Sequence, residues 1–192
     1  MRISGGAARG ITLRVPKGDV VRPATDGMRQ ALFSSLGARV AGARFLDLFA
    51  GSGAYGLEAF SRGAASGCFV EQNARAVACL RQNIAAVGKS VGRETAALQV
   101  LQADARTVPA PGEMPDLVFI DPPYELIPSL VPPLFARLRQ VLGAQPEALV
   151  LLEAPGELEL AADGWQVVKR LGKGTRQPTV TIFRQDTATP PT

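Results

Sequence analysis

The 192-residue sequence contains no histidine. This absence excludes Ser-His-Asp and Cys-His nucleophilic catalysis, and it removes the side chain that most often acts as a general base near neutral pH. Only two cysteines are present, Cys68 and Cys79, so there is no disulfide framework, and no cluster has zinc-ligand spacing. We interpret both as free thiols that pack as small apolar residues. No metal is expected, and any chemistry must use carboxylates, hydroxyls and backbone groups.

Long hydrophobic runs are also missing. No apolar stretch approaches the roughly 20 residues that cross a bilayer, and the first residues lack the apolar core of a signal peptide. Hydrophobic residues make up 46% of the chain and charged residues 20%, which is typical of a soluble globular domain. The length fits one domain of ordinary size. We therefore expect a cytoplasmic protein that does not enter a membrane.

The net charge of +4 is unevenly distributed along the chain. Residues 1–40 contain seven cationic and two acidic side chains, a balance of +5, so residues 41–192 sum to −1. A basic amino-terminal segment on a nearly neutral body favours contact with a phosphate backbone. A solvated surface that only keeps the protein soluble is an equally good explanation of this mild bias.

Hydrophobic periodicity and turn residues predict alternating strands and helices over most of the chain. Residues 1–15 are interpreted as a glycine-punctuated hairpin or arm, and a helix capped by Thr25 or Asp26 follows and ends near Leu36. The remaining predicted elements are strands at 44–49, 67–71, 97–101, 116–120 and 148–153, helices at 54–62, 127–142 and after Asn73, and a closing antiparallel hairpin at 165–171 and 179–184.

This order of elements predicts an α/β fold of the Rossmann-like kind. We expect a mostly parallel seven-stranded sheet with helices on both faces and an antiparallel hairpin at its carboxyl end. The expected parts are a basic arm and helix at 1–40, a main domain at 41–184 and a tail at 185–192 with little to anchor it. Ligands of such sheets bind beyond the carboxyl ends of the strands, where the candidate functional residues fall.

A glycine-rich turn follows the first of these strands, in residues 45–56 (FLDLFAGSGAYG). Gly51 and Gly53 permit a tight turn and let a ligand approach the backbone. Glu71, 18 residues after Gly53, can accept hydrogen bonds from ribose hydroxyls. Nicotinamide and adenosylmethionine enzymes share this pattern. Asp47 favours the second class, because a carboxylate ahead of the turn suits a ligand with a cationic amino-acid end and repels a pyrophosphate.

Asp104 lies at the end of the third predicted strand. An acceptor at this position can bond the amino group of an adenine. A helix N-cap is the alternative role, and the two roles are compatible.

The segment Asp121-Pro122-Pro123-Tyr124 ends the fourth strand and gives the strongest indication of chemistry. The prolines stiffen the backbone, so the Asp121 carboxylate and the Pro122 carbonyl can both accept from one exocyclic NH2 group. This arrangement directs the nitrogen lone pair toward a sulfonium methyl group, and Tyr124 offers a stacking face for the base. Methyl transfer of this kind needs alignment and electrostatic support more than a strong base, so the lack of histidine is no obstacle.

These motifs resemble motifs I, II and IV of class I amino-methyltransferases at LDLFAGSG (46–53), Glu71 and DPPY (121–124). The amino-terminal segments RISGG through RG (2–10), RPATD (22–26) and RQALF (29–33) narrow the resemblance to the RsmD-type family of 16S ribosomal RNA guanine-N2 methyltransferases. The resemblance covers about residues 2–184. Gly27 and Gln30 depart from the family pattern, which has an arginine and a glutamate there.

The resemblance implies S-adenosyl-L-methionine as cofactor and 16S ribosomal RNA, or a small-subunit assembly particle, as partner. We also expect a monomer. The implied cofactor-binding residues are Asp47, Phe49, Gly51, Gly53, Glu71 and Asp104. The implied catalytic residues, which hold the guanine N2 amine, are Asp121, Pro122 and Tyr124. The implied RNA-binding residues are Arg2, Arg9, Arg22, Thr25, Asp26 and Arg29.

Other functions remain compatible with parts of the pattern. Adenine N6 in DNA and a glutamine side chain in protein are alternative amines, although such enzymes usually have Asn before Pro-Pro-Tyr. DNA enzymes also carry a target-recognition insertion, for which these loops leave no room. A nicotinamide oxidoreductase would leave the Asp-Pro-Pro-Tyr segment unexplained. A non-catalytic RNA-binding or ribosome-assembly module would not need the full set of cofactor and amine-holding residues.

Overall fold

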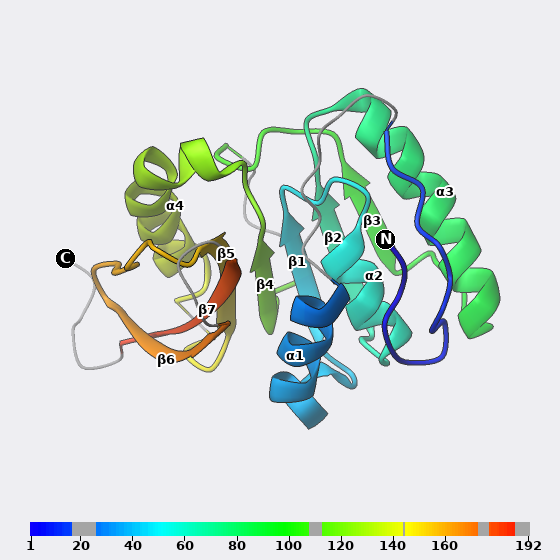
Figure 1. Ribbon diagram of the computed structural model, residues 1–192, viewed down its shortest axis with the longest axis horizontal. Coiled ribbons are helices and arrows are strands. Elements are labelled where there is room, and N and C mark those ends of the chain that lie inside the picture. The colour runs from blue at the N-terminus through cyan, green and yellow to red at the C-terminus, as the bar shows by residue number, and fades with distance from the viewer. Residues whose placement is uncertain (17–25, 108–112, 144, 173–176, 187–192) are drawn as a thin grey trace.

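The computed structural model describes residues 1–16, 26–107, 113–143, 145–172 and 177–186. They contain a seven-stranded sheet of order β3-β2-β1-β4-β5-β7-β6 (Figure 1). Strands β1 to β5 pair in parallel, and β7 is antiparallel to both of its neighbours, which confirms the predicted fold. The strands are β1 (Arg44–Leu48), β2 (Ser66–Val70), β3 (Leu98–Leu101), β4 (Leu117–Ile120), β5 (Leu149–Pro155), β6 (Trp165–Leu171) and β7 (Pro178–Gln185).

Helices cover both faces of the sheet, as predicted. Successive residues of β4 alternate between two hydrophobic clusters: Leu117 and Phe119 join one, Val118 and Ile120 the other. The first cluster includes residues of the three helices α1, α2 and α3, and the second is built around α4. The helices are α1 (Asp26–Leu36), α2 (Ala54–Ser61), α3 (Ala74–Val91) and α4 (Ile127–Val141), with short 3₁₀ turns η1 (Gly37–Val40) and η2 (Tyr124–Leu126).

Burial on both faces explains the composition of the central strands. All four residues of β4 are buried, as are six of the seven residues of β5. A parallel strand covered on both sides reads as a continuous apolar run, which is why these strands were predictable. The Asn73 cap is also confirmed, since its side chain accepts hydrogen bonds from the backbone N–H groups of Arg75 and Ala76 at the start of α3.

The amino-terminal arm, residues 1–16, packs against α2 and α3 (Figure 1). Its hairpin is reduced to one antiparallel bridge between Arg2 and Thr12. The buried carboxylate of Glu58 in α2 accepts hydrogen bonds from the backbone N–H and hydroxyl groups of Ser4, at 2.7 and 2.8 Å. Asn83 in α3 bonds both the N–H and the carbonyl of Arg14. The arm is therefore part of the fold, and its two ends lie side by side, since the Leu13 N–H donates a hydrogen bond to the Met1 carbonyl.

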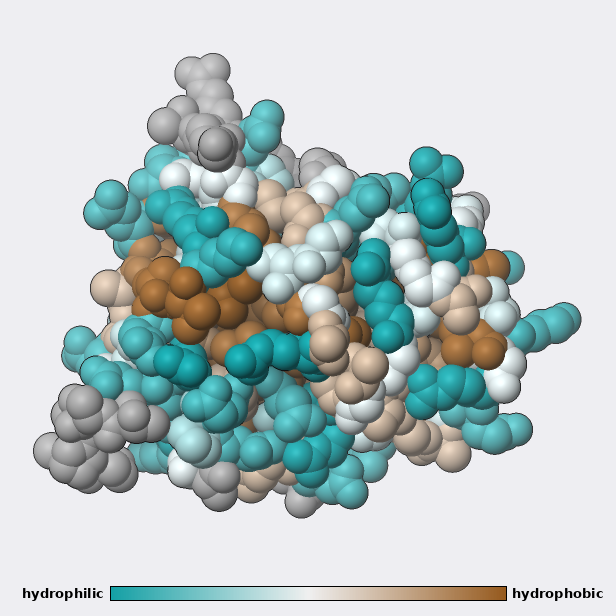
Figure 2. All heavy atoms as spheres, turned by 90° about the horizontal axis from the view of Figure 1, so that it is seen from below, coloured by the Kyte–Doolittle hydropathy of each residue, from teal (hydrophilic) through white to brown (hydrophobic). Residues whose placement is uncertain are grey.

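The carboxyl-terminal hairpin forms the end of the sheet beyond β5. Pro178 lies at the first position of β7, where the lack of an N–H group is tolerated. The edge strand β6 contains an irregularity between Val167 and Lys169, and it exposes Val167 and Val168. Figure 2, which views the molecule from below, shows a hydrophobic patch on the left, the side on which Figure 1 draws β6, with hydrophilic residues around the patch. No helix in the described ranges is long and apolar enough to cross a membrane.

Candidate active site

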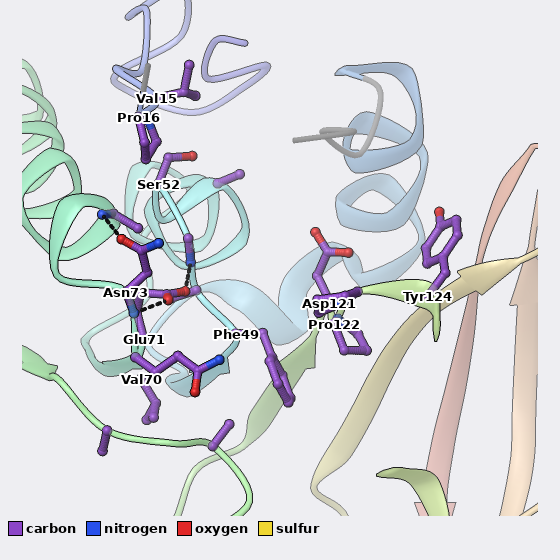
Figure 3. A pocket seen from close by; sticks show the side chains of 18 of the residues that line it. Val15, Pro16, Phe49, Ser52, Val70, Glu71, Asn73, Asp121, Pro122 and Tyr124 are labelled. Atoms are coloured by element: carbon purple, nitrogen blue, oxygen red, sulfur yellow. Dashed lines mark hydrogen bonds between the residues drawn. The ribbon is translucent and has the colours of Figure 1, made fainter. Parts of the chain in front are cut away.

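A cavity of about 610 Å³ opens at the carboxyl ends of β1, β2 and β4. This volume lies within the usual range for small-molecule sites. Figure 3 shows Glu71 and Asn73 on one side of it, Asp121, Pro122 and Tyr124 on the other, and Phe49 between them. Residues far apart in the sequence line the cavity: Met1, Val15 and Pro16 of the arm, Phe49, Gly51 and Ser52 of the glycine turn, Glu71, Asn73, Ala103, Ala105, and Asp121 to Glu125.

The glycine turn adopts backbone conformations that ordinary residues avoid. Gly51 and Gly53 have φ angles of 53° and 84°, and Phe49 has a φ of 61°. A side chain at Gly53 would also collide with Leu80 of α3, since its Cβ would lie 2.4 Å from Cδ1. Strain at a non-glycine residue such as Phe49 is typical of functional turns. The turn thereby directs Phe49 and the Gly51 backbone at the cavity.

Glu71 connects the glycine turn with the start of α3. Its Oε2 accepts a hydrogen bond from the Gly51 N–H at 2.8 Å, and its Oε1 accepts one from the Asn73 N–H at 2.7 Å. Each carboxylate oxygen has a further lone pair that can accept from a ligand hydroxyl. Glu71 thus lines the cavity, at the end of β2 where a ribose-binding residue is expected.

Asp47 lies behind the turn, not on the cavity wall. Its side chain is buried, and Oδ2 accepts a hydrogen bond from the Gly56 N–H at 2.9 Å, in the first turn of α2. Burial raises the pKa of Asp47 to about 7; the Gly56 bond opposes this shift, and the charge of Glu71 adds to it. The predicted direct contact with a cofactor is corrected here: Asp47 stabilises the helix start that carries the turn.

Asp104 is also absent from the cavity wall, although its neighbours Ala103 and Ala105 line it. The Asp104 carboxylate accepts hydrogen bonds from the guanidinium and the backbone N–H of Arg106, with a shortest ion-pair distance of 2.6 Å. The Arg106 side chain is the main reason that the pKa of Asp104 is lowered. In this arrangement Arg106 occupies the carboxylate, and a contact between Asp104 and an adenine stays a prediction.

Asp121 and Pro122 lie at the opposite end of the cavity, directly after β4. Burial raises the pKa of Asp121 well above its usual value, and the charges of Glu153 and Asp47 raise it further. The guanidinium of Arg29 acts in the opposite direction. The carboxyl group thus lies where desolvation is strong and where nearby charges have large effects.

Three residues at this end were missed by the sequence analysis: Tyr55, Glu153 and, in its actual role, Arg29. The carboxylate of Glu153 in β5 is 2% exposed and accepts hydrogen bonds from the hydroxyls of Tyr55, at 2.5 Å, and Tyr124, at 3.3 Å. One acidic residue inside the apolar run ALVLLEA (148–154) was the available signal. A buried carboxylate in a strand is rare unless it is bonded.

The predicted RNA-binding residues divide into three groups. Arg2 and Arg9 are exposed, and Arg2 forms an ion pair with Asp26 at 3.7 Å. Arg22 and Thr25 lie outside the described residues. Arg29 is completely buried, so the prediction that it contacts RNA phosphates is wrong. Its spacing places it on the apolar face of α1 together with Leu32 and Leu36.

The buried guanidinium of Arg29 is bonded inside the protein. It donates hydrogen bonds to the carbonyl of Arg2, at 2.7 Å, and to the carboxylate of Asp26, at 2.5 Å. It therefore connects α1 with the arm and contributes a positive charge beneath the site. Within the described parts of the chain, no group of three or more Cys, Asp or Glu side chains could hold a metal ion.

Comparison with known proteins gives consistent matches. A curated relative from Escherichia coli, Ribosomal RNA small subunit methyltransferase D, is 38% identical over 125 residues, which are 65% of this chain and 60% of the relative. The match thus spans less than two thirds of that protein. The Haemophilus influenzae protein of the same name is 28% identical over 175 residues, covering 91% of this chain and 89% of the relative.

Solved structures extend the comparison to nearly the whole chain. The Escherichia coli protein yhhF superimposes with a TM-score of 0.77 at 27% identity, covering 97% of this chain and 98% of that one. The family model described as Conserved hypothetical protein 95 matches residues 1–183, so both the glycine turn and the Asp-Pro-Pro-Tyr segment fall within it. The chain therefore belongs to the Conserved hypothetical protein 95 family.

Proposed function

We propose that this protein transfers a methyl group from S-adenosyl-L-methionine to the exocyclic N2 amine of a guanine in small-subunit ribosomal RNA. One observation carries the proposal: a single cavity joins the glycine turn and Glu71 to Asp121, Pro122 and Tyr124. The relatives named Ribosomal RNA small subunit methyltransferase D support the choice of substrate. An adenine or a glutamine amine is the alternative, and the same cavity would serve it.

The cofactor end of the cavity fits S-adenosyl-L-methionine. Glu71 has free lone pairs for ribose hydroxyls, and the Gly51 region exposes backbone without a Cβ in the way. Phe49 adds an apolar wall toward the amine end. When bound, the cofactor supplies an electrophilic methyl group on a sulfonium. The protein's part is to hold that methyl group in line with the incoming nitrogen.

The amine end supplies orientation. The Asp121 carboxylate and the Pro122 carbonyl accept hydrogen bonds from the two hydrogens of the NH2 group, which leaves the nitrogen lone pair directed at the methyl carbon. The bound cofactor would supply the methyl group to this nitrogen, and its sulfur would keep the electron pair of the broken C–S bond. The nitrogen then releases a proton to Asp121 or to water. Tyr124 confines the base, because its hydroxyl is tethered to Glu153.

The arm supports an RNA substrate. Met1, Val15 and Pro16 line the cavity, while Arg2 and Arg9 of the same segment are exposed. A phosphate contact by Arg2 would therefore lie beside the cavity, whereas Arg9 follows a segment bonded to Ser61 at the other end of α2 and would contact the RNA farther away. Such contacts would orient the RNA without reading its sequence. We propose a cytoplasmic location because the substrate is ribosomal RNA.

The test is a transfer assay with labelled S-adenosyl-L-methionine. Naked 16S RNA, small-subunit particles and DNA are incubated separately with the protein, and the labelled nucleotide is mapped. We expect label at N2 of a guanine in one of the two RNA samples and none in DNA. Label in DNA or in protein would assign another amine, and an absence of label in both RNA samples would refute the proposal.

A further inference from the structure

Both tyrosines of this protein donate hydrogen bonds to one carboxylate. The sequence contains only two tyrosines, Tyr55 in α2 and Tyr124 after β4. Their hydroxyls bond the two different oxygens of Glu153, which comes from a third element, β5. Since Glu153 is 2% exposed and lies outside the cavity lining, the cavity does not explain why this strand contains a carboxylate.

Tyr55 is the fixed member of this group. Its ring is 4% exposed and stacks on Phe119 of β4, with ring centroids 5.5 Å apart and an interplanar angle of 13°. Tyr124 is only partly buried and reaches the cavity. The buried Tyr55 thus holds Glu153 in place, and Glu153 in turn holds Tyr124 at the amine end of the cavity. Sites supported in this way hold their geometry better than sites on a free loop.

The strand register places Glu153 beside Asp121. Ile120 of β4 pairs with Leu152 of β5, so the next residues, Asp121 and Glu153, occupy adjacent positions. Phe119 and Leu151, two residues earlier, both belong to the cluster on the face covered by α1 and α2. Side chains two residues apart share a face, so Asp121 and Glu153 are directed to that same face.

Charged and titratable groups from four neighbouring segments face this pair, whereas β7 places the apolar Val180 beside Glu153. Arg29 comes from α1, Tyr55 from α2, Asp47 from β1, and Tyr124 from the segment after β4. Arg29 is the cation among them, and it acts on both carboxyl groups. Two adjacent carboxylates beside one buried cation form an electrostatically coupled site.

We propose that Glu153 is a positioning residue for methyl transfer, which fixes Tyr124 against the buried Tyr55 and sets a second negative charge beside Asp121. The inference rests on the proposed function, because it concerns the reaction at that site. Glu153 contacts neither cavity nor substrate, so it acts through Tyr124 and Asp121. Arg29 is its counterpart, since its positive charge favours the ionised form of Asp121 that accepts the amine hydrogens.

The charge component predicts opposite shifts of the pH–rate profile. Glu153→Gln removes a negative charge at almost constant volume, which lowers the pKa of Asp121. Arg29→Met removes the opposing cation and raises that pKa. We expect the acid limb of kcat/KM to move to lower pH by about one unit in Glu153→Gln and to higher pH in Arg29→Met. Glu147→Gln, the same change at an exposed residue just before β5, should leave the profile in place.

The positioning component predicts a loss of rate without a loss of binding. Glu153→Leu removes both acceptor oxygens, so Tyr124 loses its tether. We expect kcat to fall by up to about 100-fold, while the KM for RNA and the Kd for S-adenosyl-L-methionine stay within about twofold. If Glu153→Leu does not fold, Tyr124→Phe removes the same tether at the partly buried end and should lower kcat in the same direction.

A spectroscopic readout separates this inference from the proposed function. Protein with ¹³C at the tyrosine ring carbon that bears the hydroxyl gives two signals, one for Tyr55 and one for Tyr124. We expect both signals to move with pH at the midpoint of the acid limb, and this midpoint to be lower in Glu153→Gln. Unchanged signals and an unchanged profile in that variant would overturn the role of Glu153. If the signals shift as expected but the wild-type protein methylates no RNA, the Glu153 network stands and the proposed function is refuted.

Discussion

The two ends of the cavity differ in the groups that hold their acidic side chains (Figure 3). At the cofactor end, Glu71 is held by the backbone N–H groups of Gly51 and Asn73, which lie 20 and 2 residues away in the sequence. At the amine end, Glu153 is held by side-chain hydroxyls 98 and 29 residues away. One end is a local arrangement of turns, and the other exists only after distant segments have packed.

Burial dominates the electrostatics of the amine end. Asp121 and Glu153 both have raised pKa values, mainly through burial. Interactions between charges are strong in such a desolvated region and are weak where water enters. The comparison therefore predicts that substitutions at the amine end change the rate of transfer, whereas substitutions at the cofactor end change binding.

The largest effect is expected for Asp121→Ala. This change removes one of the two acceptors that orient the amine, while the glycine turn stays intact. We expect kcat to fall by about 10²–10³-fold, the usual cost of losing one preorganised electrostatic contact. The Kd for S-adenosyl-L-methionine, measured by calorimetry, should stay within about threefold. Asp163→Ala, at an exposed loop residue, is the control; a fully active Asp121→Ala protein would show that Asp121 does not hold the amine.

A smaller effect, on stability and not on rate, is expected for Asp47→Asn. The folded protein retains the Asp47 proton up to about pH 7, whereas the unfolded chain releases it near pH 4. Because the folded state binds more protons in this window, the free energy of unfolding falls as pH rises through it. An asparagine still accepts from the Gly56 N–H and does not titrate.

We therefore expect the free energy of unfolding of Asp47→Asn to rise relative to wild type as the pH increases from about 4 to about 7. The total difference should be on the order of a few kcal/mol and should stay constant above about pH 7. Urea denaturation at a series of pH values measures this difference. The exposed substitution Asp163→Asn should give a curve parallel to wild type in the same window. Parallel curves for Asp47→Asn as well would mean that Asp47 titrates normally in the folded protein.

At the cofactor end, Glu71→Ala is expected to weaken binding. The side chain accepts hydrogen bonds from two backbone N–H groups, and its loss removes both the ribose acceptor and the support of the turn. Hydrogen bonds to a charged group contribute about 1.5–3 kcal/mol, so the Kd for S-adenosyl-L-methionine should rise by roughly 10- to 100-fold. At saturating cofactor, kcat should recover most of its value. Glu94→Ala, at an exposed glutamate after α3, should change neither quantity.

The same contrast explains how much the sequence could predict. The sheet and its helices were predictable because buried parallel strands are apolar runs and because Asn73 and the glycines end or begin elements locally. Gly51 and Glu71 were predictable because their motif is short. Glu153 was missed because its partners Tyr55 and Tyr124 come from elements that meet only in three dimensions.

Arg29 was misassigned for a related reason. Charge alone predicted a surface contact, while its spacing to Leu32 and Leu36 already placed it on the apolar face of α1. Helical periodicity is thus the better guide where charge and periodicity disagree. Asp47 and Asp104 show a different limit: Asp47 lies inside β1 and Asp104 lies three residues after β3, and their carboxylates bond Gly56 and Arg106 and do not line the cavity.

The smallest effect is expected for Asp104→Ala, which tests the cofactor end directly. The resemblance implied that Asp104 binds adenine, but its carboxylate is bonded to Arg106, and the adjacent cavity wall consists of Ala103 and Ala105. We expect the Kd for S-adenosyl-L-methionine to change by less than about threefold, because an exposed ion pair contributes little. Titration calorimetry beside Glu71→Ala gives the comparison. Equal weakening by both substitutions would mean that Asp104 leaves Arg106 and turns into the cavity when the cofactor binds.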